Sequence, residues 1–92
     1  MTDFLNDSVR LHDLDKSDRA LVEIFLEDLS VDPRRVLAGS IAITGFTQPE
    51  PTFKYLTPEN KADWYDAESV VIPEGVPIPW QPLRKLGCVF TP

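Results

Sequence analysis

Apolar residues recur at helical spacing in one segment near the start of the chain, residues 17–30. Five of them lie three or four residues apart and would share one helix face: Leu21, Val22, Phe25, Leu26 and Leu29. Asp15 and Ser17 precede this pattern, and either side chain could cap the first helical turn. The pattern predicts one main helix that buries these five side chains.

Shorter runs of β-branched and apolar residues follow, and turn residues separate them. They predict four strands, at residues 41–47, 52–56, 69–72 and 86–91. Asp32 followed by Pro33 is a helix-start signal, and it predicts a short helix over 33–38 that Gly39 closes. Thr57 followed by Pro58 gives the same signal for a short helix over 58–67.

Proline divides the chain, because only one of the nine prolines, Pro33, comes before residue 49. We expect residues 73–82 to be extended, since proline fixes its own φ and disfavours helix at the preceding residue. Within this segment, prolines separate three apolar residues at alternate positions: Val76, Ile78 and Trp80. They form one candidate partner-binding site, an apolar edge. The alternative is that they cover the domain's own sheet.

Together these elements indicate one α+β domain over residues 1–92. A main N-terminal helix packs on a small, mostly antiparallel sheet, with a second short helix, and residues 1–12 form a flexible lead-in. A chain of this length buries roughly 60–65% of the surface of its unfolded form, so its core is small. A partner or a homodimer could add burial.

The net charge of −6 lies entirely in the first third of the chain. Residues 1–32 hold nine acids and three bases, whereas residues 33–92 hold six of each. Such a field repels nucleic acid and anionic membranes and attracts a basic protein surface. Four acids of the predicted main helix form the second candidate partner-binding site, an acidic face that could imitate the phosphates of DNA: Asp18, Glu23, Glu27 and Asp28. The simpler interpretation is that this charge keeps a small domain soluble.

Direct DNA binding by a helix-turn-helix motif is the one nucleic-acid function that the order of helices suggests. Arg34 and Arg35 would begin its second helix. Acidic residues flank that helix, and the apolar Val36 and Leu37 follow the arginines where polar base contacts are needed. The sequence therefore favours no direct contact with nucleic acid.

Few residues could support catalysis or metal binding. His12 lies between acids without a nucleophile nearby, and Cys88 stands in an apolar run where free cysteine behaves as a buried hydrophobe. The acids that begin at Asp13 lack the central glycine and final glutamate of a calcium loop. No phosphate-binding glycine loop or nucleophile elbow is present. We expect a non-enzymatic protein with no catalytic residue, metal or cofactor.

The expected location is the cytoplasm, because the sequence shows one cysteine, no signal peptide and no apolar run that could span a membrane. The expected function is to bind and modulate a larger protein with a basic surface, as inhibitors, antitoxins and anti-defence proteins of phages or mobile elements do. The alternative is a small structural or accessory subunit of an assembly such as a virion or an enzyme complex. An obligate subunit would expose a larger apolar patch than a transient inhibitor.

Overall fold

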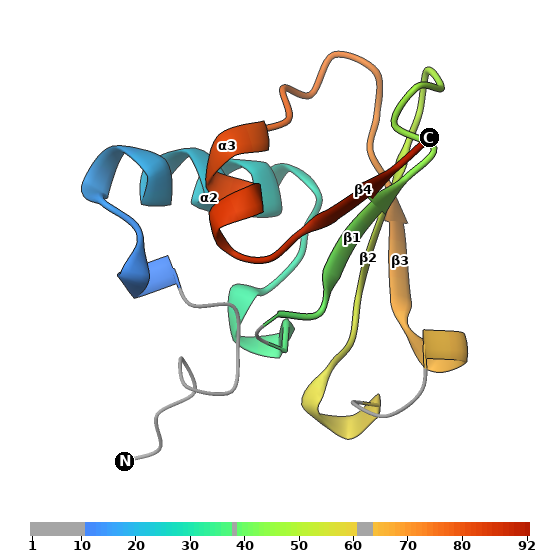
Figure 1. Cartoon of the computed structure of the whole chain (residues 1–92), viewed down its shortest axis with the longest axis horizontal. Helices are drawn as coiled ribbons and strands as arrows, with labels where there is room; N and C mark the ends of the chain where they lie inside the picture. The colour runs from blue at the N-terminus through green and yellow to red at the C-terminus, as the bar shows by residue number, and fades with distance from the viewer. Residues whose placement is uncertain (1–10, 38, 61–63) are drawn as a thin grey trace.

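The computed structural model describes residues 11–37, 39–60 and 64–92, and in it two helices cover one face of a four-stranded sheet (Figure 1). The main helix, α2 (Lys16–Asp28), packs beside the short helix α3 (Trp80–Lys85). The strands are β1 (Ile41–Thr44), β2 (Thr52–Tyr55), β3 (Glu68–Val71) and β4 (Val89–Thr91). The α+β class, the main helix and the presence of a second short helix are confirmed, although that helix is α3, in a segment predicted to be extended.

The sheet has the strand order β3-β2-β1-β4. Strand β2 pairs antiparallel with both β1 and β3, and its Phe53 lies opposite Ile43 of β1 and Val70 of β3. The last pairing is parallel, with Phe90 of β4 beside Ile43. The chain reaches β4 from β3 through α3, and this crossover gives β4 the direction of β1. The sheet is therefore mostly antiparallel, with one parallel pair.

Asp15 caps the start of helix α2, because its carboxylate accepts a hydrogen bond of 3.0 Å from the backbone N–H of Asp18. Ser17, the other candidate cap, lies inside the helix. The predicted face is buried except at one position, because Leu21 is 52% exposed. The expected burial of Leu21 is wrong, since it lies at the margin of the face that contacts the sheet.

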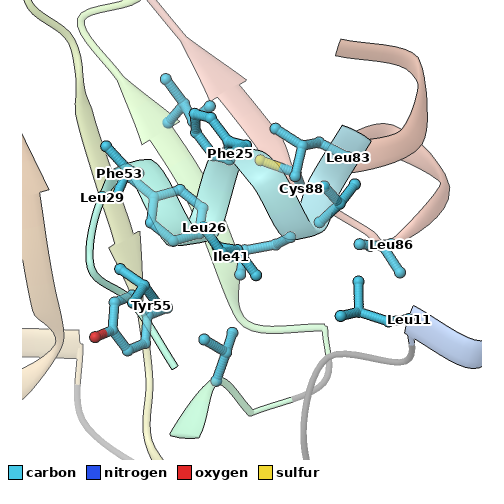
Figure 2. Close-up of a cluster of buried hydrophobic side chains, with 14 of the residues drawn as sticks. Leu11, Phe25, Leu26, Leu29, Ile41, Phe53, Tyr55, Leu83, Leu86 and Cys88 are labelled. Carbon is cyan, nitrogen blue, oxygen red and sulfur yellow. The ribbon is translucent and has the colours of Figure 1, made fainter. Parts of the chain in front are cut away.

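The core lies between α2, α3 and the inner face of the sheet (Figure 2). The rings of Phe25 from α2 and Phe53 from β2 meet edge to face, with centroids 5.6 Å apart. Leu83 of α3 and Cys88 close this cluster, so the expected burial of Cys88 is confirmed. Part of the expected lead-in also joins the core, because Leu11 is buried; residues 1–10 lie outside the described part of the chain.

The extended conformation expected for residues 73–82 ends at Pro79, because α3 begins at Trp80. Pro82 is the third residue of α3, and it fits there because N–H groups of the first helical turn have no partner within the helix. The backbone N–H of Leu83 then donates to the carbonyl oxygen of Pro79 at 3.1 Å. The last strand is correspondingly shorter than predicted and starts at Val89.

In the described residues, short 3₁₀ turns stand in place of the two predicted short helices over 33–38 and 58–67. Asp32 caps the turn Pro33–Arg35 by accepting a hydrogen bond from the backbone N–H of Arg34. The chain leaves that turn at Val36 in an extended conformation. In place of a helix over 58–67, the described residues form the turns Pro58–Asn60 and Trp64–Asp66. Cap and proline signals fix where a turn starts, but without a buried apolar stripe the turn Pro33–Arg35 does not continue into a longer helix.

Candidate functional site

The four acids of the predicted acidic face lie on two different sides of α2. At 3.6 residues per turn, Glu23 and Glu27 share one side, and Asp18 lies nearly opposite to them. The Asp18 carboxylate accepts a hydrogen bond of 2.8 Å from Nζ of Lys85 in α3, and its side chain is only 19% exposed. This bond holds the pKa of Lys85 above its ordinary value. Asp18 therefore joins the two helices, and three acids remain on the outer face of α2.

Two apolar side chains lie among those three acids on the outer face of α2. Leu21 is 52% exposed and Ile24 is 54% exposed. Leu21, Ile24 and Asp28 follow one another three and four residues apart, so they form one row along the helix, and Glu27 lies on the other side of Ile24. Ile24 is absent from the sequence-based candidates. The signal for it was an isoleucine on the side of the helix that the predicted stripe leaves polar.

Two hollows meet at Ile24. An apolar groove of about 280 Å³ lies between α2 and the segment Pro77–Pro79, and Leu21, Ile24 and Asp28 line its helical side. A second hollow of about 630 Å³ is lined by Glu23, Ile24 and Glu27 together with residues 30–33. Ile24 forms the ridge that separates the two. We call the outer face of α2 and this opposite wall the α2 docking surface, made of Leu21, Glu23, Ile24, Glu27, Asp28, Pro77, Ile78 and Pro79.

The three residues of the predicted apolar edge separate in the same way. Val76 and Ile78 are half-buried against the core, as expected if they cover the domain's own sheet. Ile78 also lines the groove beside Asp28. Trp80 is 39% exposed and turns away into α3. Its ring lies 5.7 Å from that of Phe46 and 5.1 Å from that of Phe90. The structure thus brings Ile78 to the acidic face and places Trp80 in a separate aromatic cluster.

The α2 docking surface is negative as well as apolar. Among the described residues, none forms an ion pair with Glu23, Glu27 or Asp28. The carboxylate of Asp32, at the edge of the larger hollow, is paired with the Arg34 guanidinium at 3.2 Å, which lowers the pKa of Asp32. The last two acids of α2 lie at its C-terminal end, where the helix dipole is also negative. The surface therefore has three acids whose charge is not neutralised within the described chain.

The described residues include no recognisable catalytic or metal centre. No group of three or more His, Cys, Asp or Glu side chains among them is placed to hold a metal ion. Burial raises the pKa of the Cys88 thiol to about 12, which suppresses the reactive thiolate. The side chain of His12 lies outside the described part of the structure. No helix in the described ranges has the length and apolar character needed to cross a membrane.

Comparison of the chain with protein-family models, with characterised proteins and with solved structures found no match. Function is therefore inferred from the α2 docking surface.

Proposed function

We propose that the chain is a non-enzymatic protein that docks on a larger protein through the α2 docking surface. The observation that supports this proposal is the position of Ile24, exposed between two hollows with acids on either side. Full burial of a leucine or isoleucine side chain contributes about 1.5–3 kcal/mol, so the exposed halves of Leu21 and Ile24 leave roughly 1 kcal/mol each for a partner to gain. The exposed halves of these two side chains stay outside the protein's own core.

The acids would raise the rate of association with the partner and make binding selective. Glu23, Glu27 and Asp28 place three negative charges around the apolar row, and the whole chain carries −6. Complementary charge steers association and rejects partners of the same sign, and its effect weakens as salt screens it. A larger protein with a basic surface is the partner that this arrangement favours.

The same charges argue against self-association through this surface. A two-fold contact would place Glu23, Glu27 and Asp28 of one copy against the same residues of the other. Like charges in contact cost free energy, whereas a basic partner removes that cost. The homodimer remains a prediction, and it would need a different face of the molecule.

The accessory-subunit alternative has one observation in its favour, on the outer face of the sheet. Val71 of β3 and Val89 of β4 stand on that face at the two edges of the sheet, and they are 54% and 57% exposed. A permanent subunit would bury this face in addition to α2, since obligate interfaces are large and apolar. The two functions therefore differ in how many faces a partner covers.

A photo-cross-linking amino acid placed at position 24 tests the proposal in the cells that produce the protein. Matched chains carry the same group at Lys54, on the outer face of the sheet, or at Glu74, in an exposed turn. We expect a discrete protein adduct from position 24 and none from positions 54 and 74. Adducts from both 24 and 54 would support the accessory-subunit alternative. A folded chain that yields no adduct from position 24 would refute docking through α2.

A further inference from the structure

We propose that the occupant of the α2 docking surface is a basic amphipathic helix of the partner protein. One bulky apolar side chain of that helix enters the groove between α2 and Pro77–Pro79, and neighbouring Lys or Arg side chains reach the acids around it. This inference rests on the proposed function, because it assigns the chemistry of the partner at the same surface.

The groove has two preformed apolar walls. Leu21 and Ile24 form the helical wall, and the Pro77–Ile78–Pro79 segment forms the other. Each proline fixes its own φ, so the second wall loses little conformational freedom when a ligand binds. Phe25 lies at the base of the groove and is itself buried in the core, which anchors the helical wall. An apolar group can therefore enter without the walls first having to form.

The size of the groove suits a large apolar side chain. Its volume is about 280 Å³, at the lower end of the range of about 300–1,000 Å³ typical of small-molecule sites. It corresponds to the space of roughly nine water molecules at about 30 Å³ each. One large apolar side chain fits within such a space, and the backbone that supplies it must then continue across the surface.

The charges next to the groove define what must accompany that side chain. Asp28 lies at the rim of the groove, and Glu23 and Glu27 line the hollow on the other side of Ile24. A ligand that crosses Ile24 therefore passes from an apolar site to an acidic one. A helix with an apolar anchor and Lys or Arg three or four residues away presents both kinds of group on one face. Charge-assisted hydrogen bonds to the carboxylates would fix its orientation.

Selection from a displayed library of random 18-residue peptides on the immobilised full chain tests this chemistry. Counter-selection uses the Ile24→Glu variant, which changes an exposed position and keeps the core intact. We expect peptides rich in Lys and Arg, with Leu, Ile, Phe or Trp at spacings of three and four. Peptides that depend on Ile24 but are acidic, neutral or proline-rich would overturn this inference and leave docking through α2 standing. A selection without any Ile24-dependent peptide would overturn both.

Two matched comparisons measure how much the charges and the apolar contact contribute to the affinity for the best selected peptide. Replacement of Glu23, Glu27 and Asp28 by their amides should weaken binding about 10-fold at low salt and remove most of the salt dependence. The control replaces Glu50, Glu68 and Glu74 by glutamine, which removes the same charge elsewhere and should change Kd less than about twofold. Equal losses in the two variants would show unspecific attraction and overturn the inference.

The apolar contribution has its own matched pair of positions. Ile24→Ala should weaken binding about fivefold, since the exposed half of the side chain is lost from the contact. Val71 is also 54% exposed but lies on the sheet, so Val71→Ala should leave Kd within about twofold. An equal effect of the two substitutions would contradict insertion beside Ile24.

Discussion

Cys88 should be almost unreactive in the folded chain and reactive after unfolding. Cys88 is 8% exposed and packs among the core residues, and desolvation raises the pKa of its thiol from 9.0 to about 12. The thiolate is the nucleophile. At pH 8, a thiol of pKa 9 is about 10% ionised and one of pKa 12 about 0.01%, so ionisation alone slows the reaction roughly 10³-fold. The chain has one cysteine, so labelling reports this site alone.

The same shift in pKa predicts how stability depends on pH. A thiol whose pKa is raised by folding contributes its full stability below pH 9, because both states are then protonated. Above pH 9 the unfolded chain ionises first and binds fewer protons, so the contribution is lost as the pH rises towards 12. At pH 10 the expected loss from Cys88 is on the order of 1 kcal/mol. Burial also raises the pKa of Tyr55, which contributes in the same direction.

The assay compares the rate of reaction with dithiobis(nitrobenzoate) at pH 8, in buffer and in concentrated urea. Urea denaturation at pH 8 and pH 10 of the native sequence and of Cys88→Ala then isolates the thiol from Tyr55, since the tyrosine is common to both chains. A rate in buffer within tenfold of the rate in urea would refute the burial argument, provided that the chain is folded. Equal pH dependence of the two chains would do so as well.

Three further predictions concern stability and titration. Asp15→Ala should cost about 1 kcal/mol in urea denaturation because the N-cap of α2 is lost, whereas Ser17→Ala should stay within about 0.5 kcal/mol; a larger effect at Ser17 would contradict the cap assignment. Phe53→Ala should cost about 3–5 kcal/mol and lower the midpoint of thermal unfolding, because a fully buried ring leaves a cavity; a loss below about 1.5 kcal/mol would contradict its packing. The Asp32 carboxyl should titrate below pH 3.8 when followed by carbon NMR, so its ion pair with Arg34 stabilises the fold above that pH and is lost as the pH falls. Arg34→Gln should return the midpoint of this titration towards 3.8. An unchanged midpoint would contradict the pairing.

Part of the candidate site was visible in the sequence. Glu23, Glu27 and Asp28 could be named because acids on the polar side of a helical pattern are read from spacing alone. Ile78 could be named because it stands between prolines. The position of Ile78 beside Asp28 could not be predicted, because the two residues are fifty positions apart in the sequence. Only the path of the chain after β3 brings them together.

For the same reason the structure places Asp18 and Trp80 apart from the other candidate residues. Both were grouped with neighbours in the sequence, but each makes its contacts across the fold, Asp18 with Lys85 and Trp80 with Phe46 and Phe90. Leu21 shows a related limit. Helical spacing gives the angle of a side chain around the helix axis, but the width of the buried face depends on what packs against it.

By itself, the sequence determined the α+β class, the position of α2, the burial of Cys88 and the concentration of charge in the first third of the chain. These follow from local preferences and from periodicity, which act over a few residues. Only the tertiary structure decided which of Asp15 and Ser17 caps α2, that β4 runs parallel to β1, and that an apolar groove lies beside three acids. Those features depend on contacts between distant segments, whose free energy becomes available only once the chain has closed around its core.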